Sequence, residues 1–188
     1  SPSPPFTTSS LQQAASNKLG FSVSRTMSNA QKLYESGFIT YMRTDSTSLS
    51  IDAVSSMESY ILDNFGSKYL EKRKYTTKAK VAQEAHEAIR PTDISKLDCG
   101  IDSSQKKLYK LIWERALCSQ MSNAIFDKTN LNIVSSNKYN SVFQSRGQII
   151  KFDGYLRAKN DKSNGSKDKL LPNIKLGDAV LYESIKAH

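Results

Sequence analysis

The sequence predicts an α+β protein, in which a mainly helical domain over residues 1–126 precedes an antiparallel β segment over residues 127–188. Through the first two thirds of the chain, apolar residues recur with helical spacing between capping and stop signals. After about residue 126, apolar residues alternate in short segments that Asn, Gly and Asp interrupt. This change of pattern places the expected domain boundary.

The first two helices are expected near residues 8–19 and 24–36. The hydroxyl residues at 8–10 offer N-caps for the first helix, and Gly20 offers its C-terminal stop. Gly37 ends the second helix. The expected inner face of that second helix comprises Val23, Met27, Ala30, Leu33 and Tyr34.

Two short helices joined by a glycine-containing turn resemble a helix-turn-helix. We expect a short strand that carries Tyr41 to follow them. Ser50 then caps a third helix, which stops near Gly66.

The middle of the chain alternates between charged and helical segments. Residues 71–80 read as a solvated basic loop. A helical segment that carries His86 is expected at 81–89. It should end at Arg90, because Pro91 disfavours helical backbone in the residue before it. Asp102 begins a long helix that continues to about Met121.

Composition limits the class of protein. The 188 residues carry a formal net charge of +9 and a pI of about 9.5, a balance that suggests a polyanionic partner. Two cysteines are too few for a disulfide scaffold, so a reduced, cytosolic chain is expected. No apolar run approaches the roughly 18 residues of a membrane span, and no membrane partner is expected. The proline-rich start reads as a linker, so we expect the chain to belong to something larger.

The most informative segment is residues 37–46, which read Gly-Phe-Ile-Thr-Tyr-Met-Arg-Thr-Asp-Ser. A strand would place Tyr41 and Arg43 on one face. The guanidinium there could bind a phosphate and neutralise the charge that develops when a phenol attacks it. Polar residues where a core strand would be apolar favour this functional interpretation over simple packing.

A second segment, residues 84–92, reads Glu-Ala-His-Glu-Ala-Ile-Arg-Pro-Thr. Helical spacing would bring His86 and Arg90 to one face, where both suit a phosphodiester. Glu84 and Glu87 flank the imidazole and are candidates to orient it.

These segments together resemble type IA DNA topoisomerases of the bacterial topoisomerase I branch. The blocks at residues 4–13, 18–21, 30–35, 108–113 and 152–155 match the family's pattern in the same order. The resemblance therefore covers nearly the whole chain. Met42 fits topoisomerase I, whereas the topoisomerase III branch usually has proline at that position.

The resemblance implies a mechanism. Tyr41 would attack single-stranded DNA, form a 5′-phosphotyrosyl bond and relax negative supercoils by strand passage without ATP. Arg43 and His86 would act at the scissile phosphate. The expected DNA-binding or supporting residues are Arg43, His86, Arg90, Asp45, Glu35 and Thr44. Residues 1–126 would be the winged-helix-like, domain III type catalytic-tyrosine domain, and residues 127–188 part of the β-rich arch of domain II type.

The resemblance also implies what lies elsewhere. Mg²⁺ would be held by the family's toprim domain, which these 188 residues do not contain, so no metal ligands are expected here and the chain alone is expected to be inactive. The partner would be single-stranded DNA, and the expected state is a monomer in the bacterial cytoplasm, associated with the nucleoid.

Two other interpretations stay open from the residues themselves. A winged-helix-like module that binds DNA without catalysis would explain the helices and basic charge, but not the pairing of Tyr41 with Arg43. A tyrosine recombinase also joins tyrosine to DNA, but there the tyrosine comes last, after the histidine and arginine. The polarity of a trapped phosphotyrosyl adduct distinguishes the three.

Overall fold

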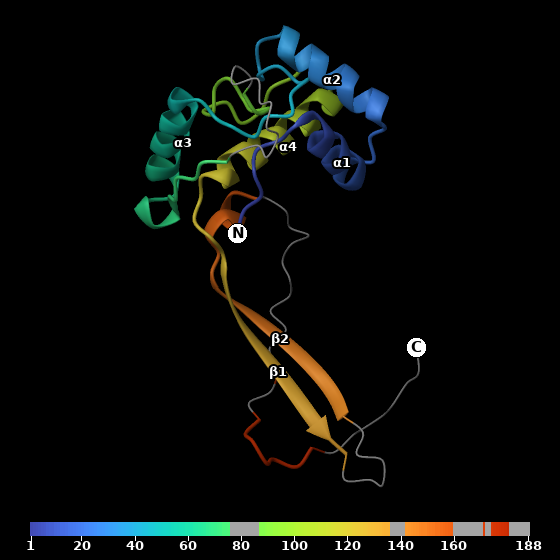
Figure 1. Ribbon diagram of the computed structural model, residues 1–188, viewed down its shortest axis with the longest axis vertical. Coiled ribbons are helices and arrows are strands. Elements are labelled where there is room, and N and C mark those ends of the chain that lie inside the picture. Colours follow the sequence, from blue (N-terminus) through green and yellow to red (C-terminus); the bar gives the residue numbers. More distant parts are fainter. Residues whose placement is uncertain (76–86, 136–141, 160–170, 172–173, 181–188) are drawn as a thin grey trace. The chain divides into compact units, whose positions relative to one another are not determined.

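The computed structural model describes residues 1–75, 87–135, 142–159, 171 and 174–180. This part of the chain forms four α-helices, two 3₁₀ helices and one two-stranded antiparallel sheet (Figure 1), so the α+β prediction is confirmed. The chain is divided into two compact units. The first comprises Ser1–Ala124 together with Asp153–Asn160, and the second contains Ile125–Phe152.

α1 (Thr8–Leu19) ends as predicted, but its N-cap lies one residue before the expected group. Thr7 has the extended backbone that a cap requires, and its hydroxyl accepts the N–H of Ser10. The hydroxyl of Ser10 in turn accepts the N–H of Thr7, which completes a capping box. Gly20 ends the helix with a left-handed φ of 66°.

α2 (Val23–Glu35) buries a more polar face than the sequence predicts. Its buried residues are Thr26, Asn29, Ala30 and Leu33. Val23 and Tyr34 are 57% and 40% exposed, so their expected place on the inner face is wrong. The buried hydroxyl and amide donate hydrogen bonds to carbonyls one turn earlier in the helix, which satisfies them without an outside partner.

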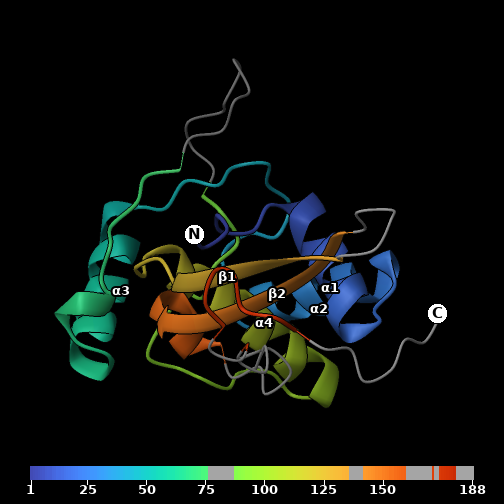
Figure 2. The same cartoon turned by 90° about the horizontal axis from the view of Figure 1, so that it is seen from below.

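α4 (Ser103–Ser119) is the central helix of the first unit and lies between α3 (Ile51–Asn64) and the pair α1 and α2, as Figure 1 and Figure 2 show. Asp102 caps it by accepting two backbone N–H groups, as predicted. Its fully buried apolar side chains are Leu108, Ile112, Ala116 and Leu117. Burial of each large one stabilises the fold by about 1.5–3 kcal/mol. No helix in the described part of the chain could cross a bilayer.

The second unit contains a β-hairpin. β1 (Ile125–Val134) pairs antiparallel with β2 (Val142–Phe152), in a register that places Thr129 opposite Gly147. The predicted change from helices to antiparallel strands is therefore observed. A turn is also present at Leu176–Gly177.

After β2 the chain returns to the first unit through η2 (Gly154–Ala158). Asp153 accepts a hydrogen bond from the hydroxyl of Tyr69, in η1 (Ser67–Tyr69), at 2.9 Å. The N–H of Tyr155 donates to the carbonyl of Ser122 at 2.9 Å. These bonds hold the returning segment against the residues that follow α4.

We predict that Gly154→Ala strongly destabilises the first unit. Gly154 has a φ of 48°, and a Cβ built there would lie 2.3 Å from the carbonyl oxygen of Asn123. Left-handed backbone alone costs about 1–2 kcal/mol for alanine, and a clash with backbone adds about 1–3 kcal/mol. Gly20→Ala is the matched control, because Gly20 has a φ of 66° with open space around it. Denaturant unfolding should show a larger loss for Gly154→Ala; equal losses would contradict the steric argument.

Candidate active site

The tyrosine segment, which we define as residues 39–46, is irregular rather than a strand. Ile39 forms an isolated β-bridge with Pro91, and the predicted strand through Tyr41 is wrong. Proline has no N–H to continue a ladder. After the bridge, carbonyls of the tyrosine segment bond instead to Thr8.

Burial nevertheless alternates along the tyrosine segment. Tyr41 is 45% exposed and Arg43 and Asp45 are also exposed, whereas Met42 and Thr44 are buried. Tyr41 and Arg43 are therefore both accessible from solvent.

Thr40 attaches the N-terminal side of the tyrosine segment to the second motif. Its hydroxyl donates to the carbonyl of Ala88 at 2.7 Å and accepts the N–H of Arg90 at 3.0 Å. Its own N–H donates to the carbonyl of Arg90 at 2.9 Å. Both hydrogen-bonding functions of the hydroxyl are thus used beside Tyr41.

Thr8, the first residue of α1, attaches the C-terminal side. Its N–H donates to the carbonyl of Thr44 at 2.9 Å, and the N–H of Thr44 donates to the Thr8 hydroxyl at 2.9 Å. The same hydroxyl donates to the carbonyl of Met42 at 2.8 Å. The backbone on both sides of Arg43 is therefore bonded to one residue of a helix.

The sequence analysis did not predict that an aromatic ring contacts Tyr41. The ring of Tyr34 meets that of Tyr41 edge to face, with centroids 5.2 Å apart and an interplanar angle of 66°. The available signal was helical geometry: with Leu33 buried, the next residue is turned by about 100° toward solvent. Tyr34, at the end of α2, thereby supports the nucleophile candidate.

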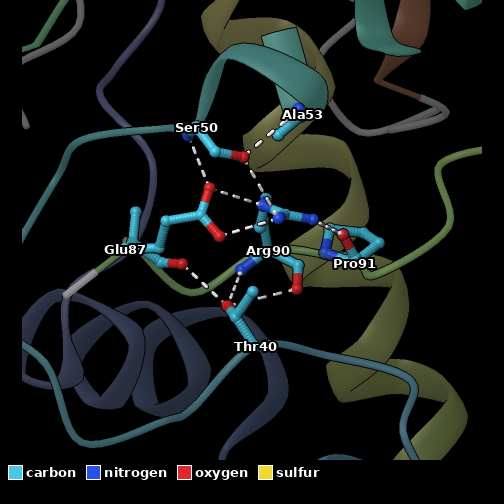
Figure 3. Close-up of polar contacts among 7 residues, drawn as sticks. Thr40, Ser50, Ala53, Glu87, Arg90 and Pro91 are labelled. Atoms are coloured by element: carbon cyan, nitrogen blue, oxygen red, sulfur yellow. Dashed lines mark hydrogen bonds and ion pairs between the residues drawn. The ribbon is translucent and has the colours of Figure 1, made fainter. Parts of the chain in front are cut away.

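The second motif forms a polar network around Arg90 (Figure 3). Its guanidinium makes two hydrogen bonds with the carboxylate of Glu87, at 3.1 and 2.7 Å, and donates to the carbonyl of Pro91 at 2.8 Å. Glu87 also accepts the N–H of Ser50, the N-cap of α3. This network joins the second motif to the start of α3.

The helix predicted at 81–89 is wrong for its described residues, 87–89. Ile89 forms a bridge with Phe6, so this stretch pairs with other segments and is not helical. The i,i+4 argument that placed His86 and Arg90 on one helical face therefore fails at Arg90, whose side chain is only 15% exposed. His86 lies outside the described residues, so its predicted role stays a prediction.

Glu87 is held in its charged form. Burial raises the pKa of its carboxyl, but hydrogen bonds from Arg90 and Ser50 outweigh burial, and the pKa lies below its ordinary value. A carboxylate with a lowered folded-state pKa stabilises the fold at pH values above its unfolded pKa. This contribution is lost as the pH falls through the folded pKa.

We predict that Glu87→Gln lowers the free energy of unfolding by about 1–2 kcal/mol at pH 7. The difference from the wild type should shrink as the pH is lowered from about 5 to 3, because the wild-type carboxyl then becomes neutral too. Asp98→Asn is the matched control, since Asp98 pairs with Lys106 at the exposed surface and such pairs contribute little. A Glu87→Gln difference that stays constant from pH 7 to 3 would contradict an ionic origin.

The weaker candidates lie in different environments. Thr44 is buried and its hydroxyl accepts the N–H of Ser46 at 3.0 Å, so it shapes the tyrosine segment. Glu35 accepts a hydrogen bond from Gln31 at 2.6 Å at the end of α2. Asp45 is exposed. Their roles as supporting residues stay predictions.

Residues 71–80 were expected to form a solvated basic loop, but the guanidinium of Arg73 is bound to the protein. Its guanidinium donates to the carbonyls of Ser119 and Met121 and, at 3.0 Å, to the side chain of Asn123. This cation is thereby used to hold the chain after α4. Residues 76–80 lie outside the described part.

Thiol and metal chemistry have little support in the described residues. Cys99 and Cys118 are buried free thiols, and burial raises the pKa of Cys118 to about 12, which suppresses the thiolate. Within the described part of the chain, no three His, Cys, Asp or Glu side chains are grouped as a metal ion would require. These residues therefore do not fit a Mg²⁺ site.

An exposed tyrosine and an exposed arginine thus lie two residues apart on a segment that two threonine hydroxyls hold. A family model described as DNA topoisomerase matches residues 1–188. The chain belongs to the bacterial DNA topoisomerase I family, of type IA.

Curated relatives and a solved structure agree. The chain is 46% identical over 184 residues to DNA topoisomerase 1 of Salmonella typhimurium, covering 95% of this chain and 21% of the relative. It is 45% identical over 184 residues to that of Escherichia coli, with the same coverage. The structure of full-length topoisomerase I from Thermotoga maritima matches with a TM-score of 0.77 and 36% identity, over 95% of this chain and 30% of that one. The chain thus spans about a fifth of the length of these curated relatives.

Proposed function

We propose that this chain supplies the tyrosine nucleophile of a type IA DNA topoisomerase and acts as part of a longer polypeptide. The observation that carries the proposal is the exposure of Tyr41 and Arg43 on a segment whose backbone is anchored on both sides. The substrate is a single-stranded segment of DNA, and the outcome is relaxation of negative supercoils.

The reaction is a transesterification. A bond forms between Oη of Tyr41 and phosphorus while the bond from phosphorus to the 3′ oxygen breaks. The phenol loses its proton, and the 3′ oxygen gains one. Because one phosphodiester replaces another, the 3′ hydroxyl can reverse the attack after a second strand has passed, and no ATP is consumed.

Arg43 contributes charge at the scissile phosphate. Its guanidinium stabilises the additional negative charge of the pentavalent transition state. In the described part of the chain no carboxylate forms an ion pair with it, so its charge is available to DNA. His86 is proposed to contact the same phosphate.

The network around Arg90 leads us to revise one role. The guanidinium of Arg90 is bound to the carboxylate of Glu87, so we propose that it does not bind DNA. Arg90 instead fixes its own backbone, whose N–H donates to the hydroxyl of Thr40. Asp45, Glu35 and Thr44 remain proposed supports of the site.

Type IA topoisomerases use Mg²⁺. Since the described residues do not fit a site for this ion, its proposed ligands lie in a toprim domain outside these 188 residues. The domain assignments at 1–126 and 127–188 and the monomeric, cytoplasmic state are likewise proposals. We expect the 188-residue chain by itself not to relax supercoiled DNA.

A trapped covalent adduct tests the proposal. The full-length enzyme is incubated with labelled single-stranded DNA, denatured, and digested so that the modified peptide and the attached DNA end are identified. We expect DNA attached through its 5′ phosphate to Tyr41. A 3′ attachment would indicate recombinase chemistry, and binding without any adduct would support the non-enzymatic winged-helix-like module.

A further inference from the structure

We propose that Thr8 is a positioning residue for the Tyr41–Arg43 pair, and that its hydroxyl sets the direction in which the two side chains leave the backbone. This inference rests on the proposed function. It assigns a catalytic contribution to a residue on α1, away from the tyrosine motif in sequence.

The hydroxyl of Thr8 is directed to the tyrosine segment. It donates to the carbonyl of Met42 at 2.8 Å and accepts the N–H of Thr44 at 2.9 Å, so its proton and a lone pair are both engaged. A second acceptor, the carbonyl of Thr44, lies 3.1 Å away. Among the described residues, this oxygen makes no hydrogen bond within α1.

The backbone of Thr8 adds a third attachment. The first N–H groups of a helix lack partners inside the helix, and that of Thr8 donates to the carbonyl of Thr44 at 2.9 Å. Residues 42 and 44 are thus bonded to the same helical residue, and the residue between them is Arg43. Its backbone direction is therefore set by α1.

The first turn of α1 packs into the core of the first unit, because Leu11, one turn after Thr8, is fully buried. On the other side of Tyr41, Thr40 is bonded to residues 88 and 90. Loss of the Thr8 hydroxyl leaves the Arg43 side of the segment held only by the backbone N–H of Thr8, through its bond to the carbonyl of Thr44. The carbonyl of Met42 and the N–H of Thr44 are then released, so Arg43 can move relative to Tyr41.

The test is made in the full-length topoisomerase with single-turnover cleavage of a short single-stranded oligonucleotide. Thr8→Val removes the hydroxyl and keeps the shape, and Thr8→Ser restores the hydroxyl. Thr7→Val is the matched control, since it removes the neighbouring hydroxyl, which caps the same helix without contacting the tyrosine segment. Equilibrium binding of the oligonucleotide and thermal melting are measured for each variant.

We expect Thr8→Val to slow cleavage by roughly 10- to 100-fold, the cost of misplacing a catalytic group, while the Kd for the oligonucleotide changes less than about twofold. Thr8→Ser should cleave within about threefold of the wild type. Thr7→Val should lower the melting temperature but cleave nearly normally.

The outcomes separate this inference from the function on which it rests. Wild-type cleavage by Thr8→Val, or equal losses in Thr8→Val and Thr7→Val, would overturn the positioning role. If Thr8→Val does not fold, Thr8→Ala removes the same hydroxyl without bulk and is read in the same way; failure of both to fold would make the hydroxyl a folding determinant and overturn the proposal. An adduct that persists in Tyr41→Phe would instead overturn the proposed function.

Discussion

Tyr41→Phe is expected to abolish the covalent DNA adduct of the full-length enzyme and with it the relaxation of negatively supercoiled plasmid. The substitution removes the only atom of the side chain that can attack phosphorus, and loss of a nucleophile costs about 10⁴-fold or more in rate. The ring is retained, so the edge-to-face contact with Tyr34 survives and stability should be unchanged. Denaturing gels with end-labelled oligonucleotide measure the adduct.

Tyr34→Phe is the matched control for this prediction. It makes the same chemical change on a ring only 5.2 Å away that is exposed to a similar degree. We expect an adduct yield within about twofold of the wild type, because the aromatic contact does not depend on the hydroxyl. An adduct that is lost in Tyr34→Phe and kept in Tyr41→Phe would transfer the nucleophile to Tyr34.

Helix positions followed from the sequence because their signals are local. Ser50 and Asp102 cap α3 and α4 as expected, and Gly20 ends α1. Ser50 and Asp102 accept backbone N–H groups two or three residues further on, and Gly20 ends its helix by its own backbone conformation, so each signal involves only neighbouring residues. The change to antiparallel pairing in Ile125–Phe152 was also readable, since alternation is a short-range pattern.

The segments that build the site could not be read in this way. Phe6 pairs with Ile89, and Ile39 with Pro91, across long stretches of intervening sequence. Nothing local marks such a pairing, whereas residues before Pro91 have good helical propensity. Tertiary pairing therefore prevailed over propensity at residues 87–91.

For the candidate site, the sequence offered the residue types but not the residues that hold them in place. Polar residue types around Tyr41 and Arg43 led to the prediction of a functional site, which stays a prediction. The anchors depend on hydrogen bonds that join residues 34 to 50 positions apart, from Thr8 to Met42 and from Thr40 to Arg90. Arg90 illustrates the limit: its charge suggested DNA, and only the position of Glu87 shows how that charge is neutralised.

Arg43→Ala is expected to slow cleavage by about 10²- to 10³-fold, the cost of losing one group that stabilises charge in the transition state. Arg43 is exposed and has no ion-pair partner among the described residues, so the substitution should leave the melting temperature nearly unchanged. Affinity for single-stranded DNA should fall modestly, and the slope of its salt dependence should decrease by about one. Arg43→Lys keeps the charge but not the two-pronged geometry, and should recover only part of the rate.

Arg146→Ala is the control for bulk charge, because Arg146 lies exposed on β2 and its replacement changes the net charge equally. We expect that variant to cleave within about twofold of the wild type, with at most a small change in salt dependence. If both arginine variants lose cleavage to the same extent, the effect of Arg43 is one of net charge. A rate loss confined to Arg43 at unchanged stability, which Arg43→Lys recovers only in part, is the result expected of a guanidinium at the phosphate that Tyr41 attacks, because such a group acts more strongly on the transition state than on DNA binding.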